Sequence, residues 1–291
     1  MLSRPVSRTF SRKALRVASA LALAVTTGLT ALVALPATAG AAEPAATLTR
    51  GPDGTFVYTA APGQTNKAKV DATIDGGMSL NLFFAIDDVV PIDAPGDDCR
   101  YPDPADRTKV SCELYAYASD AEYVALTMKL GDGNDTVTVN RQADQGNYAV
   151  AIDLGTGNDS SIQTGGKNGN LVYGGPGNDN ITVHGKGRAW GQDGKDTISV
   201  DGEESRVDGG TGNDLIYGGT GRQILTGGDG SDRVLGGTGN DVIYGSPGND
   251  ILYGNSGNDT IQGNSGNDKL YGGPGKDVLS GGPGSNVVRQ D

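Results

Sequence analysis

The chain has 291 residues, a formal net charge of −12, 36% hydrophobic residues and 48 glycines. This composition excludes an ordinary globular core packed with Leu and Phe. The negative charge excludes sequence-independent binding to nucleic acid and disfavours anionic membrane surfaces. Many carboxylates beside much glycine favour hard cations, because hard cations prefer oxygen ligands.

Residues 1–39 predict a secretory signal peptide. Five basic residues and no acid precede an uncharged run rich in Ala, Leu and Val over 17–35, and Ala37-Thr38-Ala39 then offers a small-residue cleavage site. This order of basic, apolar and small residues is typical of secretory signals. The alternative is an uncleaved membrane anchor, but Thr and Gly dilute the apolar run. We therefore expect a secreted protein, free or attached at the cell surface, with no membrane span after cleavage.

Residues 43–129 predict a β-rich N-terminal cap region. Alternating apolar and polar residues that predict strands occur at 55–58, 70–74, 80–84 and 124–128. Cys99 and Cys112 fit an oxidising compartment as one disulfide, which would pin a Pro-rich loop over 93–106. We interpret the region as a cap on the first coil that follows, because an open solenoid end invites edge pairing. The alternative is an independent small β-sandwich that binds a partner.

Residues 209–289 are nine tandem nonapeptides. The units begin at 209, 218, 227, 236, 245, 254, 263, 272 and 281. Every unit has Gly at positions one and four and an aliphatic residue at position eight, and seven units have Asp at position six. The pattern resembles the RTX (hemolysin-type) calcium-binding nonapeptide repeat, G-G-x-G-x-D-x-U-x. The resemblance implies a calcium-binding β-roll, as in secreted RTX-like proteins of bacteria.

Residues 130–208 carry the same signature at wider spacing. It ends at Asp135, Asp159, Asp179 and Asp196. The steps between successive aspartates are 24, 20 and 17 residues, and 18 more lead to Asp214, the first aspartate of the tandem units. Eighteen residues are two nonapeptides. We interpret 130–208 as degenerate coils in which one of the two loops keeps its ion-binding form.

The repeat also predicts the architecture. Positions one to six form a turn in which glycine can adopt positive φ, and positions seven to nine form a short strand with its middle residue facing inward. One unit cannot be stable alone, whereas stacked units build a continuous narrow core. The predicted fold is therefore all-β, a parallel β-roll (β-solenoid) with an N-terminal β-rich cap. Alternate loops fall on opposite sides of the roll.

The loops predict several calcium sites. A cation between consecutive loops of one side would gather about six oxygens from aspartates and backbone carbonyls, as Ca²⁺ prefers; Mg²⁺ demands tighter octahedral geometry. The candidate ligands are Asp135, Asp159, Asp179, Asp196, Asp214, Asp232, Asp241, Asp250, Asp259, Asp268 and Asp277, with the amides of Gln223 and Asn286 as weaker candidates. The alternative is that these aspartates only cap glycine-rich turns.

No catalytic motif is present in the sequence. H-E-x-x-H and G-x-S-x-G are absent, and the sole histidine, His184, lies in a predicted strand.

We expect a non-catalytic structural or interaction module that folds on extracellular Ca²⁺ and whose biological partner is unknown. The first alternative is an adhesin or a module for cell-wall glycan that uses 43–129 or an outer face with Tyr217, Tyr253 and Tyr271. Those tyrosines can equally pack across strands. The second alternative is a hydrolase with an unrecognised site.

Overall fold

A computed structural model describes residues 45–76, 80–94, 96–116, 123–141, 148–166 and 169–290. The expected signal peptide, residues 1–39, lies outside the described residues. Every regular element in the described part is a strand, and that part holds no helix long and apolar enough to cross a membrane.

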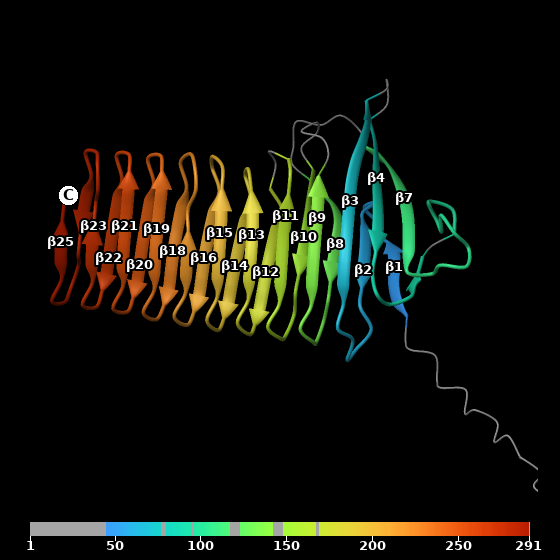
Figure 1. Cartoon of the computed structure of the whole chain (residues 1–291), viewed down its shortest axis with the longest axis horizontal. Helices are drawn as coiled ribbons and strands as arrows, with labels where there is room; N and C mark the ends of the chain where they lie inside the picture. The colour runs from blue at the N-terminus through green and yellow to red at the C-terminus, as the bar shows by residue number, and fades with distance from the viewer. Residues whose placement is uncertain are drawn as a thin grey trace, which may run out of the picture. The chain divides into compact units, whose positions relative to one another are not determined.

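Two long sheets run the length of the described chain, with parallel pairing through the repeats (Figure 1). The first sheet has the order β24 (Val278–Ser280), β22 (Thr260–Ser265), β20 (Val242–Pro247), β18 (Ile224–Asp229), β16 (Arg206–Thr211), β14 (Arg188–Asp193), β12 (Leu171–Pro176), β10 (Tyr148–Asp153), β8 (Tyr123–Lys129), β2 (Phe56–Thr59), β1 (Ala46–Arg50) and β5 (Ile92–Asp93). The second sheet has the order β25 (Val287–Arg289), β23 (Lys269–Tyr271), β21 (Ile251–Ser256), β19 (Arg233–Thr238), β17 (Leu215–Tyr217), β15 (Thr197–Asp201), β13 (Asn180–His184), β11 (Ser160–Thr164), β9 (Thr136–Arg141), β3 (Lys67–Gly76), β4 (Leu80–Asp87), β7 (Lys109–Ala116) and β6 (Cys99–Arg100).

The position-eight residues form two buried ladders, one on each sheet. On the second sheet Ile216 pairs in register with Val234, and Val234 pairs with Leu252. On the first sheet Leu225 pairs in register with Ile243. All five side chains are fully buried, since each coil covers the next. The predicted parallel β-roll is confirmed.

Five of the nine strands in the tandem units, β18 to β22, are longer than the three residues expected from the repeat. In β20 the strand begins at position seven and continues through position three of the next unit. Alternation therefore points two positions inward, the aliphatic at position eight and the glycine at position one. Among the last three strands the ladder is incomplete, because Val288 in β25 is 47% exposed. In the described residues no strand pairs with the outer edge of β25.

The N-terminal strands continue both sheets and then turn back on themselves. β2 pairs parallel with β8, and β3 pairs parallel with β9, whereas β1, β4 and β7 add antiparallel pairs. The expected disulfide between Cys99 and Cys112 joins β6 to β7. The largest fully buried side chains of the described chain are all N-terminal to residue 155: Tyr58, Phe56, Phe84, Leu82, Ile86, Ile92, Leu126, Met128, Leu130, Ile152 and Leu154.

Candidate calcium sites

The loops form two stacks along opposite edges of the roll, at the bottom and top of Figure 1. The loops that lead from the first sheet to the second form the lower stack. The tandem-repeat loops that lead from the second sheet back to the first form the upper stack. From β8 onward, each loop of the lower stack ends at one of Asp135, Asp159, Asp179, Asp196, Asp214, Asp232, Asp250, Asp268 and Asn286. The upper stack ends each loop at Gln223, Asp241, Asp259 or Asp277. The structure thus brings the predicted site residues into two columns.

One carboxylate oxygen of each aspartate joins its loop to the preceding loop. The backbone N–H of Asp214 donates to Oδ1 of Asp232 at 2.7 Å, and that of Asp232 donates to Oδ1 of Asp250 at 2.9 Å. The upper stack shows the same bond from Asp241 to Asp259 at 2.8 Å. Oδ1 therefore has a structural function, and it is oriented by the neighbouring coil.

The other carboxylate oxygen is buried and has no hydrogen-bond partner. Among the described residues this holds for Oδ2 of Asp135, Asp159, Asp179, Asp196, Asp214, Asp232, Asp241, Asp250, Asp259 and Asp268. A buried charged oxygen without a partner is strongly unfavourable, and native structures avoid it unless an ion or a water compensates. The repetition of the same orphan at one repeat position indicates a common missing partner.

Burial without compensation also changes the acidity of these groups. Desolvation raises the pKa of Asp196 and Asp232 to about 7. It raises the pKa of Asp179, Asp241 and Asp250 to about 6, against the opposing hydrogen bond from the neighbouring backbone N–H. A cation beside Oδ2 favours the ionised form and reverses this shift.

The position-one glycines leave open space beside the orphan oxygens. A side-chain carbon on Gly227 would lie 2.5 Å from Oδ2 of Asp232 and 2.8 Å from the carbonyl oxygen of Gly245. A carbon on Gly236 would meet Oδ2 of Asp241 at 2.8 Å and the carbonyl oxygen of Gly254 at 2.6 Å. Each space is therefore bounded by a carboxylate oxygen of one loop and a carbonyl oxygen of the next. Glycine at position one keeps this space open, a function that the sequence pattern alone did not reveal.

The position-four glycines have a different function, because they permit close stacking. Gly212 has φ +143° and lies so close to the preceding loop that a side-chain carbon would overlap the carbonyl oxygen of Gly194. A larger residue would separate the two loops and break the column of oxygens. Both the positive φ and the close approach therefore require glycine.

The lower-stack loops that follow β8 and β10 differ from the later ones. Their position-one residues are Leu130 and Leu154, which are fully buried, in place of glycine. Leucine side chains fill the inward direction that glycine leaves empty, although Asp135 and Asp159 retain the Oδ1 bond of the stack at 2.7 Å. Burial raises the pKa of Asp135 to about 6. These two loops therefore keep the stacking bond of aspartate and lack the position-one glycine, although Oδ2 of Asp135 and of Asp159 is also buried without a partner.

The two amide substitutions and the last aspartate of the upper stack have distinct surroundings. Gln223 turns its buried, unpartnered Oε1 toward the space beside Gly218, while its Nε2 donates to Thr220. Asn286 uses its Oδ1 to accept from Asp268 and presents its Nδ2 nitrogen to the space beside Gly281. Oδ2 of Asp277 accepts from the Gln290 side chain at 3.1 Å. Gln223 is thus the better oxygen donor of the two amides.

Asparagine at position five forms a second ladder on the exposed rim. Oδ1 of Asn249 accepts from the backbone N–H of Asn267 at 2.8 Å, and Oδ1 of Asn258 accepts from Lys276 at 2.8 Å. This ladder runs in the opposite direction to the aspartate ladder. The recurring Gly-Asn-Asp triplets are a sequence signal for it, but the nonapeptide pattern specifies only the aspartate.

The family model for the RTX calcium-binding nonapeptide repeat matches four segments of the chain, at residues 164–184, 190–222, 226–261 and 253–288. Residues 164–288 are RTX calcium-binding nonapeptide repeats. The resemblance seen in the sequence is confirmed for this region. No curated protein matches the chain.

The RTX loops of this chain fit calcium. They offer buried carboxylate oxygens without a partner, carbonyl oxygens that converge on the same space, and glycines that keep the space open. Calcium takes six to eight such oxygen ligands in flexible geometry. When bound, it would supply the positive charge that two columns of buried carboxylates lack.

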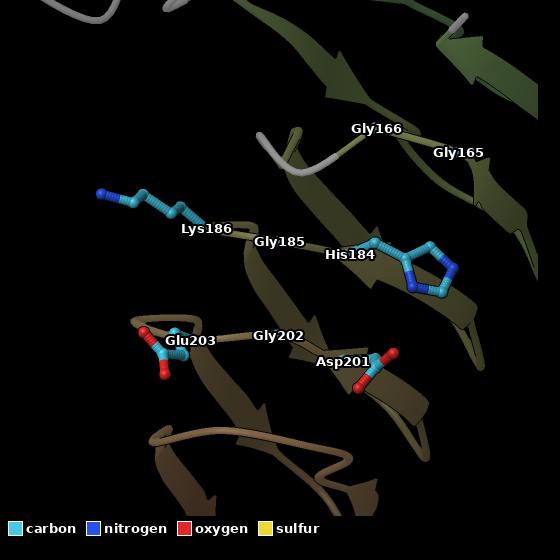
Figure 2. Close-up of a pocket in the computed structure, with 8 residues that line it drawn as sticks. All are labelled: Gly165, Gly166, His184, Gly185, Lys186, Asp201, Gly202 and Glu203. Atoms are coloured by element: carbon cyan, nitrogen blue, oxygen red, sulfur yellow. The ribbon is translucent and has the colours of Figure 1, made fainter. Parts of the chain in front are cut away.

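The upper edge of the degenerate coils has a groove instead of RTX loops (Figure 2). It has a volume of about 530 Å³, and Figure 2 shows the side chains of His184 and Asp201 on one side, with Lys186 and Glu203 on the other. Asp201 accepts hydrogen bonds from the backbone and hydroxyl of Thr220, which lower its pKa. Its carboxylate therefore stabilises a turn. The groove lies where each degenerate coil has, in place of a second RTX loop, a connection without the nonapeptide pattern.

Proposed function

We propose that this protein is a secreted, non-catalytic structural module whose RTX roll folds when it binds several calcium ions outside the cell. The observation that carries the proposal is the column of buried, unpartnered Oδ2 atoms along each edge of the roll. Without cations, like charges stack coil upon coil in a desolvated position. Calcium binding and folding are therefore coupled.

The candidate ligands divide into two groups. Glycine spaces accompany Asp179, Asp196, Asp214, Asp232, Asp250 and Asp268 in the lower stack, and Gln223, Asp241, Asp259 and Asp277 in the upper stack. We assign calcium to these loops. Asp135 and Asp159 lie beside Leu130 and Leu154, so we assign them a stacking function and no ion of comparable affinity.

The N-terminal part acts as a calcium-independent cap in this proposal. Its strands extend both sheets of the roll, and its buried residues belong to the same hydrophobic core as the repeats. We place the cap at 43–129, degenerate coils at 130–208 and the tandem units at 209–289. Large buried side chains and the Cys99–Cys112 disulfide stabilise the cap, and its edges give the first repeats a template for pairing.

A calcium titration of the full mature chain tests the proposal. After EDTA treatment, added Ca²⁺ should produce a steep gain of β-sheet circular dichroism, and calorimetry should show cooperative binding of several ions. Mg²⁺ at the same concentration should produce little change, because it demands tight octahedral geometry. An unchanged spectrum and melting temperature with and without Ca²⁺ would refute the proposal.

A further inference from the structure

The outer face of the first sheet has a stacked aromatic pair that is followed in register by two shorter side chains. Tyr173, Trp190, Asp208 and Thr226 are neighbours in register on β12, β14, β16 and β18. The rings of Tyr173 and Trp190 stack at 4.6 Å with an interplanar angle of 6°. One face of the Trp190 ring is therefore covered by Tyr173. Its other face looks toward Asp208, whose side chain is much shorter than an aromatic ring.

A surface depression of about 240 Å³ lies at this step. It is lined by Ala189, Trp190, Arg206, Val207, Asp208, Ile224 and Thr226. The depression combines an indole face, a carboxylate, a guanidinium and a hydroxyl, and Figure 1 shows the strands that carry them side by side. In the described part of the chain Arg206 is exposed and has no ion-pair partner.

We propose that this depression binds a pyranose ring of a neutral glycan. The apolar C–H face of the sugar stacks on the free face of Trp190, while its hydroxyl groups hydrogen-bond to Asp208, Arg206 and Thr226. Aromatic side chains supply large apolar contact, and a few placed polar groups fix orientation, which is the usual composition of small-ligand sites. The calcium loops take no part in the contacts.

The mixture of polar groups selects this ligand class. A quaternary ammonium ion prefers an aromatic cage, and Arg206 would repel it. A proline-rich peptide offers mainly backbone carbonyl acceptors and so gives no further donor to the Asp208 carboxylate, which already accepts from the backbone of Gly210. An anion would be repelled by Asp208. A sugar hydroxyl both donates and accepts, so it satisfies the carboxylate and the guanidinium at the same time.

The site depends on calcium only through the folding of its coils. Trp190 directly precedes Gly191, the position-one glycine of a lower-stack loop, and Asp208 directly precedes Gly209 in the next loop. Stacking of these loops therefore sets the distance between the indole and the carboxylate. Calcium binding measured separately distinguishes a failure of the glycan site from a failure of the calcium sites.

The chain contains a single tryptophan, so intrinsic fluorescence reports on this site directly. The full mature chain in Ca²⁺ is titrated with neutral tetrasaccharides of glucose, mannose and N-acetylglucosamine, and with a galacturonate tetrasaccharide. We expect a saturable change in Trp190 emission with at least one neutral probe at millimolar concentration. No saturable change with any neutral probe, or tighter binding of the galacturonate probe, would overturn the proposal.

Variants assign the binding to these side chains. Calorimetry should show about tenfold weaker binding for Trp190→Ala and clearly weaker binding for Asp208→Asn, while Trp190→Phe retains most of the affinity. Tyr253→Ala removes a stacked outer-face aromatic from the other sheet and is the matched control, with affinity within twofold. Circular dichroism in Ca²⁺ verifies folding, and Asp208→Asn tests the site if Trp190→Ala does not fold. Equal affinity of Trp190→Ala, Asp208→Asn and Tyr253→Ala would contradict the assignment.

Discussion

The backbone N–H of Asp232 donates a 2.9 Å hydrogen bond to Oδ1 of Asp250 in the next loop of the lower stack, while Oδ2 of Asp250 is buried without a partner. One carboxylate thus has two functions in the calcium-binding roll. Oδ1 connects successive coils, and Oδ2 is available to a cation. Because the two oxygens have different functions, substitutions can separate them.

Asp250→Asn should remove calcium without removing the stacking bond. An asparagine oxygen can accept the bond from the preceding loop, as Asn286 does from Asp268 at 2.7 Å, but it offers no second oxygen to the cation. We expect lower calcium content by elemental analysis and a higher calcium midpoint by circular dichroism. At saturating Ca²⁺ the variant should keep the β-sheet signal of the roll, because it retains the stacking bond and buries one charge fewer.

Two comparisons sharpen this prediction. Asp250→Ala loses both oxygens and should lower the melting temperature in Ca²⁺ by more than Asp250→Asn does. Asp277→Asn should have a smaller effect on calcium content than Asp250→Asn, since Oδ2 of Asp277 already accepts from Gln290. Equal calcium loss at both positions would argue against stacked, shared sites.

Gly227→Ala should block one calcium space in the middle of the lower stack. The added carbon would lie 2.5 Å from Oδ2 of Asp232 and 2.8 Å from the carbonyl oxygen of Gly245, which leaves no room for an ion with both ligands. We expect a lower ion count by elemental analysis and a weakened, less cooperative titration. Asp229→Asn is the matched control, because it removes a negative charge from the same loop at an exposed position. If Asp229→Asn lost as much calcium as Gly227→Ala, bulk acidity would explain binding better than the glycine space.

Hydrogen exchange should divide the chain into a calcium-independent and a calcium-dependent part. Large buried side chains, among them Leu130 and Leu154, and a disulfide stabilise the strands up to about residue 160, so we expect this part to depend less on a cation. The coils from 174 onward bury mainly single aliphatics beside unpartnered carboxylates. In EDTA we expect protected amides in 45–160 and fast exchange in 174–290, with protection restored by Ca²⁺. Uniform loss of protection over both parts would show that the cap does not fold without calcium.

Acid should stabilise the calcium-free roll. Burial raises the pKa of Asp196 and Asp232 to about 7 in the fold, whereas the unfolded groups titrate near 3.8. A carboxyl group with a raised folded pKa contributes stability that is complete below its unfolded pKa and is lost as pH rises through its folded pKa. In EDTA we therefore expect the β-sheet circular dichroism of the roll to increase as pH falls from about 8 towards 5.

Calcium should reverse this dependence. Cation binding requires ionised aspartates, so protonation competes with it, and the calcium midpoint should increase over the same range of falling pH. The measurement is a circular dichroism spectrum at each pH in EDTA and during titration with Ca²⁺. A β-sheet signal in EDTA that falls steadily with acid would contradict the buried, uncompensated state of these carboxylates.

The nine-residue repeat is sufficient to predict the architecture of the roll. Position eight holds aliphatic residues such as Ile216 and Ile243, and the nine-residue period allows these to be buried only if units stack. The same period places loops eighteen residues apart on one edge, as the bond from Asp214 to Asp232 shows. The pattern underestimates the length of strands such as β20. Glycines at positions one and two are typical of turns, but the backbone at these positions still pairs with the neighbouring strand.

The sequence by itself thus determined the β-roll, the two columns of aspartates and calcium as the fitting ion, because a strict local period leaves one way to bury its aliphatics. The tertiary structure decided what depends on neighbouring coils. It showed that Oδ1 and Oδ2 differ, that a side chain at position one would meet Oδ2 of Asp232, and that buried Leu130 and Leu154 replace this glycine in two coils. It also placed Trp190 beside Asp208, residues eighteen positions apart. Such relationships arise between coils, so the order of residues within one repeat does not contain them.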